Sequence, residues 1–81
     1  MVAHELKIWP EYFENVYYGY KRFEVRKNDR VFKVGDDVRL REWDPKTESY
    51  TGEYVDVRIT YVLNGPLVIE GLTIFGFVLL D

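Results

Sequence analysis

Apolar and polar residues alternate along several stretches of the chain, as expected for β-strands with one buried and one solvated face. The longest such stretch is Glu53 to Leu63, in which every odd-numbered residue from Val55 onward is apolar or aromatic. A shorter alternation covers Ala3 to Trp9. Both segments are therefore predicted to be strands, and the odd-numbered side of the longer one is predicted to face the core.

The alternation from Lys21 to Lys27 separates two kinds of side chain. Phe23 and Val25 share one face of the predicted strand, and we expect this face to meet the core. The opposite, polar face carries Arg22, Glu24 and Arg26.

Two further strands are expected after this one. Val38 to Trp43 follows a turn at Gly35-Asp36, and Thr73 to Leu80 is so uniformly apolar that burial on both sides is expected. Segments rich in polar residues, glycine or proline separate the strands and are predicted to be turns. These are Asn28 to Arg30, Asp44 to Ser49 and Asn64 to Pro66, with Gly52 closing the second or marking a bulge.

A single segment, Pro10 to Tyr18, has the periodicity of a helix. Pro10 suits the first turn, where a backbone N–H would lack a partner, and Gly19 is placed to end the helix in a left-handed conformation. Apolar residues recur along one side at Trp9, Phe13, Val16, Tyr17 and Tyr20. We interpret this stripe as core packing rather than as a platform for stacking bases.

The elements follow the order strand, helix and then four strands, which fits one domain spanning residues 1–81. Hydrophobic residues make up 47% of the chain and aromatic residues 17%, enough apolar surface for one core. We predict an α+β fold that is mainly β, with a small barrel or strongly curved sheet and the helix at one end.

The composition excludes several classes of site. The chain has no Cys and one His, so a disulfide framework, a thiolate zinc site and a cysteine nucleophile are all excluded. We expect no metal and no cofactor. No apolar stretch is long enough to span a membrane, and the N-terminus lacks the pattern of a signal peptide, so we expect a cytoplasmic protein without membrane contacts.

Basic residues are unevenly distributed along a chain whose formal net charge is −3. Residues 21–41 contain eight of the eleven Lys and Arg residues, against four acidic residues. Such a segment either presents a basic field to an anionic partner or forms ordinary solvated strand faces. The charge pattern alone does not choose between these two interpretations.

Lys21, Glu24 and Arg26 stand close together just after Gly19, where the chain turns from helix to strand. A carboxylate between two cations can accept hydrogen bonds from a base edge or order the cations around a phosphate. The alternative is a salt-bridge network at the surface, which adds little to stability.

These residues match the G-x-K-x-x-E-x-R signature of the ASCH domain, a branch of the PUA-like superfamily. The chain also resembles a small bacterial and phage family of unknown function related to ASCH. The similar segments are His4 to Ile8, Arg26 to Arg30, Val34 to Asp36 and Leu40 to Trp43. The resemblance covers residues 3–63, and the remainder shares only a hydrophobic closing strand.

The resemblance implies a PUA-like pseudo-barrel of five to six strands with the helix beside a cleft. Because PUA-like domains commonly bind RNA, it also implies an RNA- or nucleotide-binding module. The cleft would be lined by Lys21, Glu24 and Arg26, with His4, Lys7, Asn28 and Arg30 near it. Phosphate contacts would supply affinity, and polar side chains would read a base.

Two alternatives stay open. One ASCH branch is an amidohydrolase acting on acetylated cytidine, in which the motif Lys works with a Thr and a distant Glu. This chain has the Lys as Lys21, but Glu24 stands where the Thr would be, so an enzyme here would use Lys21 and Glu24. The missing Thr favours binding over catalysis. The second alternative is a protein-interaction or phage accessory domain with a vestigial cleft.

Overall fold

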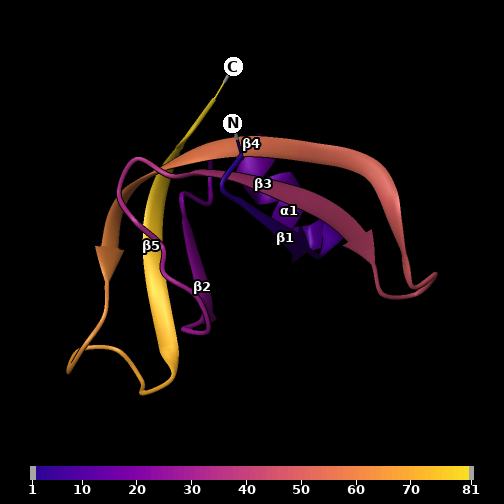
Figure 1. Ribbon diagram of the computed structural model, residues 1–81. Helices are drawn as coiled ribbons and strands as arrows, with labels where there is room; N and C mark the ends of the chain where they lie inside the picture. Colours follow the sequence, from indigo (N-terminus) through magenta and orange to yellow (C-terminus); the bar gives the residue numbers. More distant parts are fainter. Residues whose placement is uncertain (1, 81) are drawn as a thin grey trace.

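The computed structural model describes residues 2–80, which form five strands and one helix (Figure 1). The elements are β1 (His4–Ile8), α1 (Pro10–Tyr17), β2 (Phe23–Lys27), β3 (Asp37–Asp44), β4 (Ser49–Leu63) and β5 (Leu72–Leu79). All strands belong to one sheet of order β1-β3-β4-β5-β2, in which β1 runs parallel to β3 and the other neighbours are antiparallel. Strands β1 and β2 are therefore the two edges of the sheet.

The sheet curls into a half-barrel, with β3 and β4 arching over α1 (Figure 1). Apolar side chains of every element except β2 meet on the concave side, and Phe32 joins them from the loop between β2 and β3. The buried core consists of Ile8, Phe13, Val16, Phe32, Val38, Leu40, Val57, Ile59, Phe75 and Phe77. The predicted mainly β fold with a small pseudo-barrel and one N-terminal helix is confirmed.

Strand β2 alternates as predicted, but its two faces are exchanged. Glu24 is buried, with 4% of its surface exposed, whereas Phe23 and Val25 are 50% and 47% exposed. The prediction that Phe23 and Val25 face the core is therefore wrong. The reason is local: β2 is an edge strand, and partners from its own segment satisfy the charge of Glu24 on the inner side.

The aromatic stripe of the helix is buried only in its centre. Phe13 and Val16 belong to the core, but Trp9, Tyr17 and Tyr20 are exposed, so the prediction of core packing is wrong for these three. The helix has only eight residues and contacts mainly β3. Trp9 precedes this short helix, Tyr17 is its last residue and Tyr20 follows it, so these three rings lie beyond the part of the helix that packs on the core.

In β4, the predicted core face holds as far as Ile59 and then changes. A register shift against β5 between Ile59 and Tyr61 places one extra residue, Thr60, in β4. Beyond this bulge Val62 packs against the core, and Tyr61 is exposed instead of buried as predicted. Burial of β5 on both sides is also wrong, because Val78 at its end is half-exposed.

The β3–β4 hairpin is longer than the sequence pattern predicts. Strand β4 begins at Ser49 rather than at Glu53, so Gly52, with φ of 96°, lies inside the strand. A register shift in β3 between Arg41 and Trp43 lies opposite this part of β4.

Over residues 2–80, no helix is long and apolar enough to cross a membrane.

Candidate functional site

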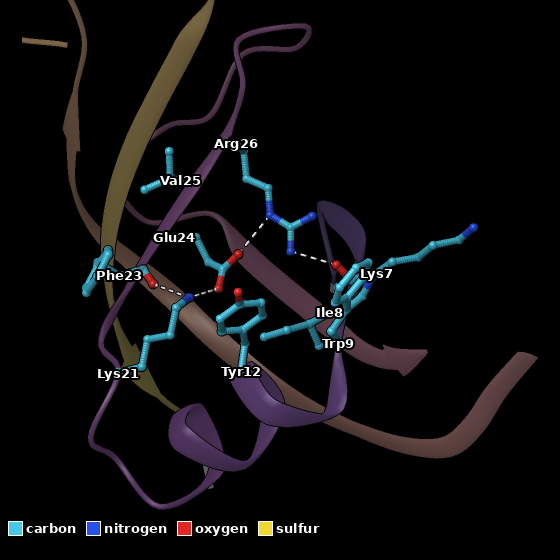
Figure 2. Close-up of a pocket in the computed structure, with 9 residues that line it drawn as sticks. All are labelled: Lys7, Ile8, Trp9, Tyr12, Lys21, Phe23, Glu24, Val25 and Arg26. Carbon is cyan, nitrogen blue, oxygen red and sulfur yellow. Dashed lines mark hydrogen bonds and ion pairs between the residues drawn. The ribbon is translucent and has the colours of Figure 1, made fainter. Parts of the chain in front are cut away.

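A pocket of about 630 Å³ lies where the two edges of the curled sheet approach each other. Its walls come from the end of β1, the start of α1, and Lys21 together with most of β2 (Figure 2). The lining residues are Lys7, Ile8, Trp9, Tyr12, Lys21, Phe23, Glu24, Val25 and Arg26. The pocket therefore contains the three motif residues that the sequence places close together.

Glu24 is the centre of the polar wall of this pocket. One carboxylate oxygen accepts a hydrogen bond from Lys21 Nζ, and the other accepts one from Arg26 Nε at 2.8 Å (Figure 2). The Glu24 side chain is only 5% exposed, whereas those of Lys21 and Arg26 are 20% and 23% exposed. The carboxylate is thus covered by its own two cations, which remain at the pocket surface.

The end of the helix sets the position of Lys21. Gly19 takes a φ of 83°, a conformation that glycine adopts without strain, and the chain reverses there. The carbonyl of Asn15 then accepts hydrogen bonds from the backbone N–H groups of Tyr20 and Lys21, at 2.9 and 3.0 Å. Lys21, the lysine of the motif, is therefore fixed to the helix by its main chain.

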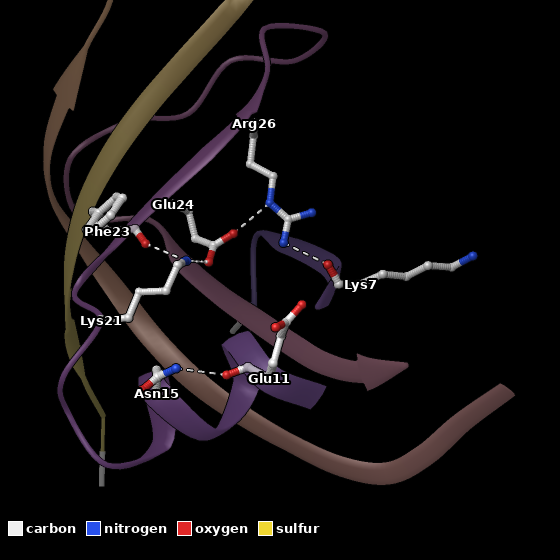
Figure 3. A network of polar contacts seen from close by, with 7 residues as sticks. All are labelled: Lys7, Glu11, Asn15, Lys21, Phe23, Glu24 and Arg26. Atoms are coloured by element: carbon white, nitrogen blue, oxygen red, sulfur yellow. Dashed lines mark hydrogen bonds and ion pairs between the residues drawn. The ribbon is translucent and has the colours of Figure 1, made fainter. Parts of the chain in front are cut away.

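The Lys21 side chain returns across the start of β2. Its Nζ donates to the Phe23 carbonyl at 2.8 Å as well as to Glu24, so the ammonium group is held above the strand (Figure 3). An ammonium has three N–H donors, and these contacts use two of them. The third donor is available for an acceptor in the pocket.

Arg26 joins the two edges of the sheet. Its guanidinium donates from Nε to Glu24 and from Nη2 to the carbonyl of Lys7 at 2.7 Å, which bridges β2 to β1 (Figure 3). A guanidinium has five N–H donors, so these two contacts leave three free for other acceptors. Arg26 therefore both closes the pocket wall and offers a planar donor group to an anion.

Aromatic side chains form the other wall. Trp9 and Tyr12 are 49% and 47% exposed although both line the pocket. The Lys21 ammonium lies 5.9 Å from the centre of the Tyr12 ring and 5.2 Å from that of Phe23. Trp9 and Tyr12 are site residues that the sequence does not predict, because only the approach of β1 to β2 in space brings them next to the motif.

Lys7 lines the pocket differently from the motif residues. Its main-chain carbonyl faces Arg26, but its side chain leads away from the other labelled residues (Figure 2). The Nζ atom lies 4.6 Å from the centre of the Trp43 ring. Lys7 thus lies at the pocket through its main chain, with its charge directed toward the neighbouring face of the sheet.

The structure places His4 outside the pocket. The ring of His4 donates from Nε2 to Asp36 Oδ2 at 2.9 Å and packs on Phe32, with 4.7 Å between the ring centres. The hydrogen bond from His4 is the main cause of a lowered pKa at Asp36. His4 thus ties the start of β1 to the loop before β3.

Asn28 and Arg30 also lie away from the pocket. The Asn28 backbone N–H donates to the carbonyl of Gly71 at 2.9 Å, so this residue secures the end of β2. Arg30 lines a smaller hollow of about 440 Å³, together with Lys27 and Asp29, and Arg26 lines both this hollow and the pocket. Of the seven predicted binding residues, the pocket unites four: Lys7, Lys21, Glu24 and Arg26.

The basic segment, residues 21–41, does not form a single surface. Lys21 and Arg26 line the pocket, whereas Arg39 and Arg41 belong to the outer face of β3 and contact the rings of Tyr54 and Tyr50.

In the part of the chain that the structure describes, no group of three or more potential His, Cys, Asp or Glu ligands could hold a metal ion.

Two comparisons connect the chain to known proteins. A family model described as "Domain of unknown function (DUF3850)" matches residues 3–77. The chain is also 44% identical over 59 residues to the "Uncharacterized 12.9 kDa protein in GpA 3'region" of Escherichia phage P2. This match covers 73% of the chain but 52% of the phage protein, so the chain spans about half the length of that relative.

Proposed function

The chain belongs to the DUF3850 family, whose description assigns no activity, and we propose that its pocket binds RNA or a nucleotide. The observation that carries this proposal is the pairing of two walls in one pocket. One wall presents Lys21 and Arg26, and the other presents half-exposed aromatic rings. A phosphate needs the first kind of wall, and a base needs the second.

The two cations are held ready for an anion. Glu24 fixes both of them, so little side-chain entropy remains to be lost when a ligand binds. Together they retain four N–H donors beyond their contacts with Glu24 and with main-chain carbonyls. The role of Glu24 in this proposal is to position Lys21 and Arg26, because its own oxygens are already engaged.

Trp9 and Tyr12 supply surfaces on which a base can stack. A base stacked on an aromatic side chain contributes about 1–3 kcal/mol, whatever its identity. Similarity to the ASCH and PUA-like domains supports the same proposal, since the signature residues Lys21, Glu24 and Arg26 all line the pocket. A cytoplasmic location, where RNA and nucleotides are abundant, belongs to this proposal.

The hydrolase alternative is less well supported by the same contacts. A general base must be reached by the proton that it abstracts, but the Glu24 carboxylate is only 5% exposed and lies beneath the two cations that donate to it. Incubation with acylated nucleosides, followed by mass spectrometry, tests this alternative. Product formation that is lost in Glu24→Gln would favour catalysis over simple binding.

The direct test is a titration of the purified protein with nucleoside monophosphates and with a labelled RNA of about eight nucleotides, at several salt concentrations. Lys21→Met should weaken binding about tenfold and reduce the salt dependence, because one phosphate contact is lost. Trp9→Ala should weaken binding by a similar factor through lost stacking.

Two control variants separate the pocket from general charge and aromatic effects. Lys33→Ala removes an exposed cation from the loop before β3, and Tyr20→Ala removes an exposed ring outside the pocket. Both should bind like the wild type. Equal losses in Lys33→Ala and Lys21→Met, or no saturable binding of any ligand, would contradict the proposal.

A further inference from the structure

The outer face of β1, β3 and β4 carries cations and aromatic rings in close contact. Lys7 lies over Trp43, Arg41 over Tyr50 and Arg39 over Tyr54, with 4.6, 3.8 and 4.1 Å from each charged group to the ring centre. We call these six residues the outer platform. They lie opposite the core face, because Val38, Leu40 and Val57 alternate with them and are buried.

The charges of the outer platform are unequally compensated. Arg39 makes a bidentate ion pair with Asp56, with hydrogen bonds of 2.9 and 3.0 Å. Arg41 has a looser contact of 3.5 Å with Glu5. Within residues 2–80, Lys7 has no ion pair. Lys7 and Arg41 are therefore the cations that can take up a phosphate.

The rings and the guanidinium groups provide flat surfaces beside those charges. Tyr50 and Tyr54 are exposed, and the side chains of Arg39 and Arg41 beside them are 34% and 39% exposed. Sheet faces that combine cations with exposed aromatic rings bind single nucleic-acid strands, because bases stack on the rings while cations follow the backbone.

The outer platform is continuous with the pocket through Lys7. The carbonyl of this residue accepts the hydrogen bond from Arg26 in the pocket wall, and its ammonium reaches Trp43 on the outer platform. A strand leaving the pocket therefore meets the platform next. We propose that the outer platform binds nucleotides flanking the one in the pocket, so that the ligand is a single nucleic-acid strand rather than a free nucleotide. This inference rests on the proposed function of the pocket.

The experiment compares two ligands with the full chain: uridine monophosphate and a labelled oligouridine RNA of about eight nucleotides. The RNA should bind at least about tenfold more tightly, since the platform adds stacking and phosphate contacts. Arg41→Gln and Tyr50→Ala should each weaken RNA binding about fivefold to tenfold. Neither variant should change the affinity for uridine monophosphate.

Control variants test whether position matters. Arg58→Gln removes a cation of β4, the strand that carries Tyr50, and this cation is paired with Asp37 and not with a ring. Tyr61→Ala removes an exposed ring beyond the bulge. Both should leave RNA binding unchanged. A DNA strand of the same sequence shows whether the platform distinguishes RNA, and retained circular dichroism and melting behaviour verify folding.

The outcomes separate this inference from the pocket proposal. The platform proposal fails and the pocket proposal stands in either of two cases. The RNA binds no more tightly than uridine monophosphate, or Arg41→Gln and Arg58→Gln lower the affinity for RNA equally. If RNA binding depends on Arg41 but not on Lys21, the pocket proposal fails, and with it the inference that the platform binds nucleotides flanking the one in the pocket. If neither ligand binds, both proposals fail.

Discussion

Strands β2 and β3 carry the same kind of alternation, yet they turn opposite kinds of residue toward the core. Strand β3 buries Val38 and Leu40 completely, whereas β2 buries Glu24 and leaves Phe23 and Val25 half-exposed. The two strands also differ in place: β3 lies between two strands and against the helix, while β2 is at an edge.

The difference shows how stability and binding are divided in a chain this small. An interior strand must remove apolar surface from water, because a short chain has few other sources of stability. An edge strand beside a pocket can bury a carboxylate if cations reach it, and Lys21 and Arg26 do so from the same segment. We therefore expect substitutions in β3 to change folding and those in β2 to change binding.

The largest effect on stability is expected at Leu40. Its side chain is fully buried in the centre of the core, so Leu40→Ala should lower the free energy of unfolding by about 3 kcal/mol. Urea denaturation followed by circular dichroism measures this loss. A loss below about 1 kcal/mol would mean that β3 is not the strand on which the core depends.

A smaller effect on stability, with a larger effect on binding, is expected at Glu24. Glu24→Gln keeps the shape but removes the charge that holds Lys21 and Arg26, and should cost roughly 1–2 kcal/mol. The partly exposed cations can turn to water, which limits the loss. Denaturation and ligand titration of the same variant measure the two effects.

The matched control for this prediction is Glu70→Gln, which removes the same charge from an exposed residue outside the pocket. It should change stability and binding little. If Glu24→Gln left nucleotide affinity at the wild-type value, Glu24 would not position the two cations for a ligand.

The sequence predicts that β2 and β3 are both strands, because the alternation of side chains depends only on neighbouring residues. It does not predict which side of β2 faces inward, since that depends on the pocket that β2 forms with α1 and with β1, the strand at the opposite edge of the sheet. The prediction that Tyr61 faces the core is wrong for another reason, because a single-residue bulge at Thr60 exchanges the faces of β4.

The candidate site divides in the same way. The motif residues Lys21, Glu24 and Arg26 are close in sequence and remain close in space, so local reasoning finds them. Trp9 and Tyr12 join them only through tertiary structure. His4 stands at the start of β1, whereas the pocket is lined by the end of that strand. Its hydrogen bond with Asp36 is a contact across 32 residues that no local pattern reveals.

A third prediction concerns the contact between His4 and Asp36 at the entry to β3. Because this hydrogen bond holds the pKa of Asp36 below its ordinary value of 3.8, the unfolded chain binds more protons between the two values. The stabilisation is therefore complete above pH 3.8 and is lost as the pH falls through the lowered pKa. Asp36→Asn should cost roughly 1 kcal/mol near neutral pH.

The difference between wild type and Asp36→Asn should shrink as the pH is lowered below 3.8. Urea denaturation at several pH values measures it. Asp29→Asn serves as the control, because Asp29 is exposed and lies 3.6 Å from Arg30 in a loose ion pair. If the difference in unfolding free energy between wild type and Asp36→Asn grew on acidification, the pKa of Asp36 would not be lowered in the folded protein.

The smallest effect is expected for Val25→Thr, and its contrast with Val38→Thr is the sharpest test of the comparison between the two strands. Val25→Thr and Val38→Thr make the same chemical change at an edge strand and at an interior strand. Val38 is fully buried, so its new hydroxyl would lose water and should cost about 1–3 kcal/mol. Val25 is 47% exposed, so its hydroxyl stays hydrated, and Thr suits a strand as well as Val does. Val25→Thr should therefore change the unfolding free energy by less than about 0.5 kcal/mol. Equal losses in the two variants would mean that β2 packs its apolar residues as β3 does, and that Glu24 is not its inward residue.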